Sequence, residues 1–346
     1  MINVGIIGCG KIAQTRHLPE YAGNSNCRIS ALFDMNFERA SDLAKQYNAR
    51  AYKSVDELLE DQTIDAVSVC AANNAHAEIT IKALKAGKHV LCEKPMATTI
   101  EDCEKMVRVA NEKEKYLMID QNQRLSGAHM KAKELIKSGA IGKVLTFRTT
   151  FGHCGPETWS VDPGVTSWFF DKKLASMGAM ADLGVHKTDL IQFLVDGKVV
   201  ETKAHITTLD KRGADGNLIG VDDNAICIYT MDNGIVGTMT ASWTYYGEED
   251  NSTVLYGTKG IMKIYQNPDF SIEIITRNGE RILYDIDQIQ TNENQTKSGV
   301  IDAFIDSLVN GHEPIISGES VLAAMRAVFA SVESARKNQA IRIEQK

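Results

Sequence analysis

The sequence predicts an α/β chain with an N-terminal doubly wound parallel sheet and a C-terminal α+β domain on a large open, mainly antiparallel sheet. Two observations predict it. Short apolar runs alternate with amphipathic stretches over residues 1–123, whereas residues 199–285 hold one strand-like run after another. At 346 residues the chain is long for one domain, so we expect two, 1–123 and 124–346, with closing helices that pack back on the first.

The N-terminal elements have the rhythm and lengths of right-handed βαβ units. Each apolar run is short, and most are followed by a stretch with apolar residues at helical spacing, as in the helix that Gly87 ends. The predicted strands are 3–8, 28–33, 66–70, 89–92 and 116–120, and the predicted helices are 37–47, 76–86 and 100–114.

The C-terminal elements change to short strands separated by turn sequences such as Asp232-Asn233-Gly234 and Asn278-Gly279. Because these strands form no repeat, we expect one sheet rather than a repeat array. The predicted strands are 144–151, 200–208, 224–231, 235–243, 253–256, 260–265, 270–276 and 281–284, and the predicted helices are 128–138, 182–196, 300–310 and 320–337.

Composition excludes several classes of protein. The net charge is −7, from 38 basic and 45 acidic side chains without a long run of one sign, which argues against a nucleic-acid partner. The seven cysteines are scattered without a CxxC pair, as in a reduced cytosolic protein. The start of the chain reads as a strand rather than a signal peptide, and no apolar run is long enough for a membrane, so we expect a cytoplasmic protein.

The first motif is Gly8-Cys9-Gly10-Lys11-Ile12-Ala13, a G-x-G-x-x-A loop between a strand and a helix. Its glycines allow a tight turn and close approach to a pyrophosphate, and the helix N-terminus attracts phosphate charge. Asp34 ends the second strand, where a carboxylate accepts hydrogen bonds from ribose hydroxyls and repels a 2′-phosphate. NAD is favoured over NADP, although Arg39 lies nearby in the sequence. The alternative is a tight turn beside a surface aspartate.

The second motif is Glu93-Lys94-Pro95, directly after the predicted strand 89–92. A lysine at the carboxyl end of a parallel strand points into the crevice where nucleotides bind. Its ammonium could stabilise alkoxide character on a reacting oxygen during hydride transfer. Pro95 restricts the preceding backbone to extended geometry. Without other motifs, a solvated surface lysine is the alternative.

The third motif places Asp182, His186 and Asp189 on one stripe of a helix, away from its apolar face. A histidine titrates near neutral pH and can accept a hydroxyl proton, and a neighbouring carboxylate can orient it. A solvated helical face is one alternative. Metal binding is another, but no further His/Cys cluster completes a site, so we expect no metal.

Together these motifs resemble the glucose–fructose oxidoreductase / inositol dehydrogenase / rhizopine catabolism (Gfo/Idh/MocA) family over nearly the whole chain. The resemblance includes Ala86–Pro95, Ile136–Lys143 and the Asp182-x-Gly-x-His186 signature. It implies an N-terminal Rossmann domain and a C-terminal domain whose open sheet often mediates oligomers, here a homodimer or homotetramer. It also implies that Lys94 and His186 act on a substrate hydroxyl, with Asp182 assisting.

By motif position, the resemblance implies that Ala71, Asn73, His76, Asn122 and Arg124 join the glycine loop and Glu93-Lys94 in the cofactor site. Two departures from the family pattern bear on the site. The common Thr-Pro-Asn is Ala71-Ala72-Asn73 here, which makes that turn less rigid. The family's usual glycine-rich lead into the Asp…His signature is Ser176-Met177-Gly178-Ala179-Met180 here, so we expect the floor of the substrate pocket to differ.

Substrate binding is predicted from aromatic and turn-rich segments, because aromatic faces pack against the C–H groups of sugar rings. His153, in the segment Phe151–Trp159, is the best additional candidate. Trp168, Trp243, Tyr245 and Tyr246 are further candidates, with core or oligomer contacts as the alternative for each.

The sequence therefore predicts an NAD-dependent oxidoreductase that transfers a hydride between a secondary hydroxyl of a sugar, polyol or glycoside and the nicotinamide. One alternative is a glycoside hydrolase or lyase that retains NAD and oxidises its substrate transiently. Another is a non-catalytic NAD-sensing regulator, against which the intact Lys94, Asp182 and His186 argue.

Overall fold

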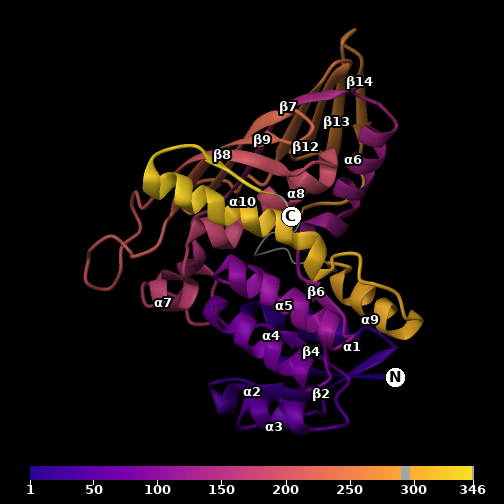
Figure 1. Cartoon of the computed structure of the whole chain (residues 1–346), viewed down its shortest axis with the longest axis vertical. Helices are drawn as coiled ribbons and strands as arrows, with labels where there is room; N and C mark the ends of the chain where they lie inside the picture. The colour runs from indigo at the N-terminus through magenta and orange to yellow at the C-terminus, as the bar shows by residue number, and fades with distance from the viewer. Residues whose placement is uncertain (290–296, 345–346) are drawn as a thin grey trace. The chain divides into compact units, whose positions relative to one another are not determined.

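The computed structural model describes residues 1–289 and 297–344, and by its contacts the chain divides into two units (Figure 1). The first unit holds 1–122, 159–161 and the described residues 297–322. The second holds 123–158, 162–289 and 323–344. The first unit therefore includes α9 (Val300–Asn310), although this helix follows most of the second unit in the sequence.

The first unit is built on a six-stranded, entirely parallel sheet in the order β3-β2-β1-β4-β5-β6. This order reverses direction beside β1, so the crevice at the carboxyl ends of β1 and β4 is where a doubly wound sheet binds its ligand. The predicted doubly wound sheet is confirmed. Its strands are β1 (Ile2–Ile7), β2 (Cys27–Phe33), β3 (Arg50–Ala51), β4 (Ala66–Val69), β5 (His89–Cys92) and β6 (Leu117–Ile119).

Three helices of this unit begin where a polar side chain caps them. Asn36, Ser54 and Thr99 each accept a hydrogen bond from a first-turn backbone N–H, which satisfies a donor that the helix leaves open. The short β3 and α3 carried no pattern long enough to predict. The helices are α1 (Leu18–Ala22), α2 (Phe37–Gln46), α3 (Val55–Glu60), α4 (His76–Lys85), α5 (Ile100–Glu112) and α9.

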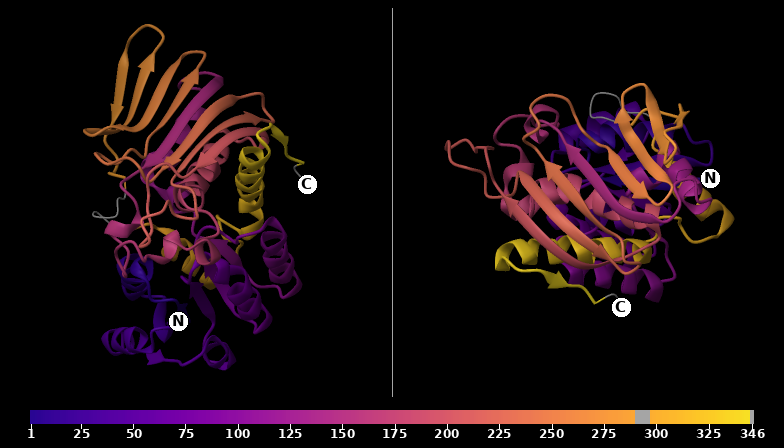
Figure 2. Two further views of the ribbon diagram at one scale, coloured as in Figure 1. Left: turned by 90° about the vertical axis from the view of Figure 1, so that its left-hand side faces the viewer. Right: turned by 90° about the horizontal axis from the view of Figure 1, so that it is seen from above.

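The second unit is built on a nine-stranded sheet in the order β14-β13-β12-β11-β7-β10-β9-β8-β15. Only the pair β7–β10 is parallel, so the expectation of a mainly antiparallel sheet is confirmed. In Figure 2, β7 runs among strands that come later in the chain. The strands are β7 (Val144–Gly152), β8 (Val199–Thr207), β9 (Asn224–Met231), β10 (Val236–Ser242), β11 (Thr253–Gly257), β12 (Gly260–Asn267), β13 (Phe270–Thr276), β14 (Arg281–Tyr284) and β15 (Ile341–Arg342).

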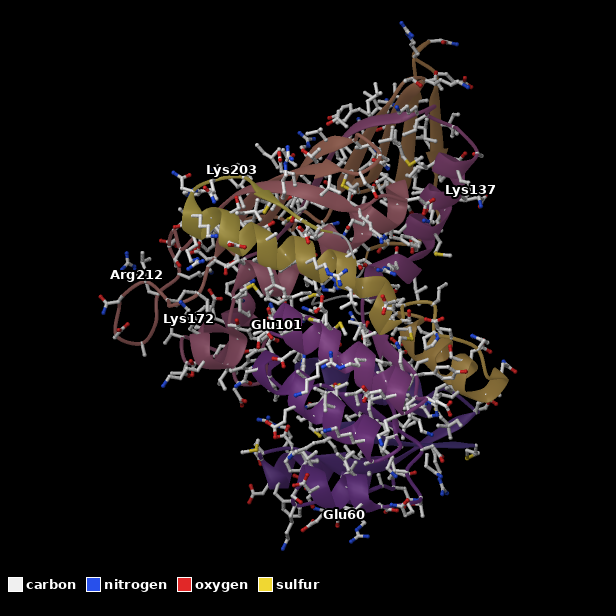
Figure 3. All side chains as sticks on the ribbon, viewed as in Figure 1. Glu60, Glu101, Lys137, Lys172, Lys203 and Arg212 are labelled. Atoms are coloured by element: carbon white, nitrogen blue, oxygen red, sulfur yellow. The ribbon has the colours of Figure 1, made fainter. Side chains whose placement is uncertain are left out.

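One face of this second sheet is covered by helices. Charged side chains of this unit, such as Lys137 and Arg212, lie exposed at its surface (Figure 3). Tyr229 of β9 hydrogen-bonds Thr188 on α8 at 2.9 Å, while Thr202 of β8 hydrogen-bonds Ser331 on α10 at 3.0 Å. None of the helices in the described part of the chain is long and apolar enough to span a membrane. The helices are α6 (Gly127–Lys137), α7 (Lys172–Ala175), α8 (Val185–Val195) and α10 (Gly318–Lys337), whose first residues lie in the first unit.

Candidate active site

The glycine loop of the first unit has the geometry that a pyrophosphate requires. Gly8 has φ +96°, and a Cβ there would lie 2.5 Å from the Cys70 carbonyl oxygen, so only glycine fits. A Cβ on Gly10 would meet nothing within 4 Å, so this backbone faces open space. Ala13 is fully buried at the start of the π-helical turn Ala13–His17, and Lys11 and Ile12 are half-buried before it. The loop therefore fits a dinucleotide.

Asp34 is tied to the glycine loop by main-chain hydrogen bonds. Its Oδ2 accepts the Cys9 N–H at 2.7 Å, and its Oδ1 accepts the Asn36 N–H at 2.7 Å. Arg39 Nη1 lies 3.7 Å from Oδ1. The carboxylate is thus fixed at the end of β2, where it would receive ribose hydroxyls.

The loop after β4 and the Glu-Lys-Pro loop are joined through His76. Its Nδ1 lies 2.8 Å from the Pro95 carbonyl oxygen and its Nε2 lies 3.0 Å from that of Ala71. Asn73 is buried in the short 3-10 turn between these positions. His76 is also buried, so it would shape a cofactor site through the two loops that it joins.

Glu93 and Lys94 follow β5 and differ in environment. Glu93 is buried, and its Oε2 accepts the backbone N–H of Lys94 at 3.0 Å. Its Oε1 lies 3.0 Å from His17 Nε2. Lys94 is only half-buried, although it directly follows the buried Glu93.

Asn122 and Arg124 follow β6 in the 3-10 helix Asn122–Leu125. Asn122 is half-buried at the last residue of the first unit. Arg124, in the second unit, pairs with buried Asp189 through two hydrogen bonds, from Nε at 2.7 Å and from Nη2 at 2.5 Å. Asp189 therefore neutralises Arg124, and the last residue of the predicted helical stripe has a structural partner.

The segment that carries Asp182 is held at its N-terminus by Asp222, a residue that sequence reasoning did not find. Asp222 accepts the N–H of Gly178 at 2.8 Å and of Met180 at 2.7 Å. A Cβ on Gly178 would lie 1.8 Å from the Asp222 carbonyl oxygen, which explains the glycine. The pattern Ser176–Met180 thus begins the π-helical turn Met180–Gly184, which continues into α8.

Asp182 lies near two side chains of the second unit that directly follow strands β10 and β7. Its Oδ2 accepts the indole N–H of Trp243 at 3.0 Å, and His153 Nε2 lies 3.8 Å from the same oxygen. His153 Nδ1 accepts the Gly155 N–H at 3.0 Å, so the ring proton belongs on Nε2, toward Asp182. Trp243 is fully buried, and it serves the site as a donor rather than as a stacking surface.

His186 lies one helical turn after Asp182, and both are buried, at 7% and 6% exposure. The alternative of a solvated helical face is therefore wrong. The ring centroid of Phe151 on β7 is 6.1 Å from that of His186 and 5.9 Å from that of His153, so Phe151 lies near both histidines. Within the described residues, the one group of three side chains arranged to hold a metal is His17, Glu93 and Asp120, apart from this helix.

A buried lysine beside His186 was not predicted. Lys187 is fully buried, and its Nζ donates to the Asn251 carbonyl oxygen at 2.9 Å. Burial lowers its pKa to about 7, against the opposing charges of Asp250 and Glu249. No sequence pattern indicates this, because helical spacing alone does not show that every side of α8 is covered.

The remaining aromatic candidates lie in different settings of the second unit. Trp168 is half-buried and stacks on Phe169, with 4.0 Å between ring centroids. The Tyr245 ring packs against Gly152, where a Cβ would lie 2.2 Å from it. Tyr246 is exposed and donates its hydroxyl proton to Asp210. Phe169 in turn lies edge-on to Trp243, with 6.4 Å between ring centroids, so Trp168 is linked to Trp243 through Phe169.

Comparisons with known proteins find sugar and polyol dehydrogenases that match most or all of the chain. A levoglucosan dehydrogenase of Pseudarthrobacter phenanthrenivorans is 31% identical over 82% of this chain and 80% of its own. A myo-inositol 2-dehydrogenase of Thermotoga maritima is 25% identical over 99% of both chains. A solved levoglucosan dehydrogenase in complex with NADH and levoglucosan matches with a TM-score of 0.85 and 25% identity over 100% of both chains. A D-xylose 1-dehydrogenase [NADP(+)] of Haloarcula marismortui is 24% identical over 99% of this chain and 93% of its own.

Two family models cover most of the sequence. The first, an oxidoreductase family with an NAD-binding Rossmann fold, matches residues 2–121. The second, the Gfo/Idh/MocA C-terminal domain, matches residues 129–263. The two models together match most of the chain, and the levoglucosan dehydrogenase is 31% identical to it, so the chain belongs to the Gfo/Idh/MocA oxidoreductase family.

Proposed function

We propose that this oxidoreductase oxidises a secondary ring hydroxyl of a sugar, polyol or glycoside with NAD⁺. The observation that carries the proposal is the buried set of Asp182, His186 and Trp243 in a chain that also holds a pyrophosphate-compatible glycine loop. The substrates named for the relatives, levoglucosan and inositol among them, carry ring hydroxyls of this kind.

Each proposed catalytic residue has one task. His186 takes the hydroxyl proton, because a neutral imidazole is a competent base near neutral pH. Asp182 orients the imidazole and stabilises its charge, and Trp243 in turn fixes the Asp182 carboxylate. Lys94 stabilises the developing alkoxide. When bound, the nicotinamide supplies the hydride acceptor.

Substrate and cofactor selection rest on three further residues. His153 is proposed to bind substrate, because its ring lies beside Asp182 while its Nδ1 is fixed by Gly155. Trp168 is proposed as an aromatic wall for the sugar ring. NAD is proposed over NADP because Asp34 would place its charge beside a 2′-phosphate. An NADP-linked relative makes this preference a matter for measurement.

The open face of the second sheet supports a homo-oligomer. Ile226 and Ile228 on β9 are 47% and 49% exposed, and Val236 on β10 lies in the neighbouring strand, also exposed. A contiguous apolar surface of this kind marks an interface, and a second copy would cover it. A monomer by light scattering would contradict this. The seven free thiols support a reducing, cytoplasmic location.

The test is NADH formation by the purified protein across inositols, aldoses, anhydrosugars and glycosides. We expect turnover with one class and, for Lys94→Met, a loss of kcat of about 10²–10³ with NAD affinity retained. Met matches the length of the lysine without its charge, so the variant isolates the ammonium. Silence across the panel with NAD copurifying, or full turnover by Lys94→Met, would contradict the proposal.

A further inference from the structure

A buried charged network lies directly beneath Lys94, and the reaction as proposed does not use it. It consists of His17 at the end of the first π-helical turn, Glu93 after β5 and Asp120 after β6. All three side chains are buried, and His17 Nε2 is 3.0 Å from Glu93 Oε1 and 3.3 Å from Asp120 Oδ2. The imidazole therefore lies against two carboxyl groups.

The two carboxylates are not equivalent. Burial alone would lower the pKa of His17, but Cys70, Asp120 and Glu93 together raise it well above its usual value. Burial alone would raise the pKa of Glu93, but the hydrogen bond and charge of His17 lower it. Burial and the charge of Glu93 raise the pKa of Asp120. His17 and Glu93 thus form the ion pair, and Asp120 is the group that holds a proton more readily.

The same histidine is anchored on its other side. His17 Nδ1 lies 3.3 Å from Ser68 Oγ on β4, which in turn lies 2.7 Å from the hydroxyl of Tyr21 on α1. The imidazole therefore reaches from β4 to the Glu-Lys-Pro loop. Glu93 in turn restrains the main chain at Lys94, because its second carboxylate oxygen accepts the Lys94 backbone N–H at 3.0 Å.

We propose that His17 is a positioning residue for hydride transfer, which fixes the Glu93 carboxylate and through it the main chain from which Lys94 leaves. The inference rests on the proposed function, in which Lys94 acts on the reacting oxygen. A buried ion pair adds little net stability, because the cost of burying the charges offsets their attraction. Stability therefore does not account for the His17–Glu93 pair, whereas a role in orienting Lys94 does. A displacement of about 1 Å at a reacting group costs about 10²-fold in rate.

The test compares two amide replacements of His17. The amide nitrogen of Gln takes roughly the place of Nε2, and that of Asn roughly the place of Nδ1. His17→Gln keeps a donor toward Glu93, whereas His17→Asn keeps one toward Ser68 only. We expect His17→Asn to lower kcat by about 10- to 100-fold and His17→Gln by about threefold or less. NAD affinity should stay within about twofold in both.

Two readouts separate positioning from a general loss of structure. With a substrate deuterated at the carbinol carbon, His17→Asn should show a larger isotope effect on kcat than the parent, since hydride transfer becomes the slow step. The double variant His17→Asn/Glu93→Gln should lose no more than either single variant, because both break one chain of contacts. Tyr21→Phe is the control; it removes the hydroxyl beyond Ser68 and should keep kcat within about twofold.

Equal kcat for His17→Asn and the parent, or equal losses in the Asn and Gln variants, would overturn the inference. If His17→Asn does not fold, Glu93→Gln decides by the same readouts, and an unchanged kcat there overturns it. Lys94→Met separates the two levels. Its inactivity beside a fully active His17→Asn refutes only the positioning role, whereas its full activity removes the proposed function and the inference together.

Discussion

The two units bring together their candidate site residues by different means. In the first unit, the arrangement depends mainly on main-chain groups. Gly8, Cys9 and Gly10 form the loop, and Asp34 accepts hydrogen bonds from two backbone N–H groups. In the second, side chains far apart in the sequence meet, as Trp243 meets Asp182 across 61 positions. We call the residues of the first set the loop half-site and the residues around Asp182 and Trp243 the packed half-site. The loop half-site can be recognised from the spacing of residues in the sequence, whereas the packed half-site cannot.

The largest expected effect falls on the packed half-site. His186→Ala should lower kcat by about 10²–10⁴, because the proposed general base is lost. NAD affinity should change little, since His186 belongs to the second unit. Steady-state kinetics and NAD titration measure both quantities. His205→Ala, at an exposed position on β8, is the matched control and should leave kcat unaltered.

If His186→Ala weakened NAD binding as strongly as it lowered kcat, the comparison between the units would fail. The proton-accepting role would fail if kcat of the variant stayed near that of the parent.

A second prediction concerns the buried cation of the packed half-site. The pKa of Lys187 is about 7 in the folded protein, whereas an unfolded lysine titrates near 10.4. Between these values the unfolded chain binds more protons, so the free energy of unfolding of the parent rises as pH rises through this window. Below it, the native state bears the full cost of a buried ammonium.

Lys187→Met removes this charge at similar volume. The variant should be more stable than the parent by about 1–4 kcal/mol near pH 6, and this difference should shrink toward pH 9. Urea unfolding at both pH values measures it. Lys137→Met at the exposed end of α6 is the control. A difference that did not vary with pH would show that the lysine does not change protonation there.

The fold could be predicted because most strands of both sheets appear in the sequence as short apolar or alternating runs. Strands β5, β9, β13 and β14 have the bounds that the sequence predicted. The two-residue strand β3 was not predicted, because so short a strand has no periodic pattern of apolar residues. Gly8 and Asp34 were found by spacing, whereas Asp222, Lys187 and His17 were not. Their roles depend on which side chains tertiary packing surrounds them with, and a single sequence does not record that.

A third prediction separates the two glycines of the loop half-site. Gly10→Ala adds a methyl group where the structure has open space, so the variant should fold normally. The methyl occupies room that the pyrophosphate would need, and the Kd for NAD should rise about 10- to 100-fold. Gly8→Ala should instead lower the Tm, because its Cβ meets the Cys70 carbonyl oxygen and φ is +96°. Equal effects of both variants on Tm would contradict this division.

The smallest expected effect is at Asp34, because its carboxylate has both a structural and a selective task. Asp34→Asn keeps the shape and an acceptor oxygen for the Asn36 N–H, but it removes the charge that would repel a 2′-phosphate. The ratio of kcat/KM for NAD to that for NADP should fall about tenfold. Because Cys9 loses a charged acceptor, NAD binding should also weaken slightly. A ratio that stayed constant while both affinities fell would assign Asp34 to the glycine loop alone, and cofactor choice would then lie elsewhere in the first unit.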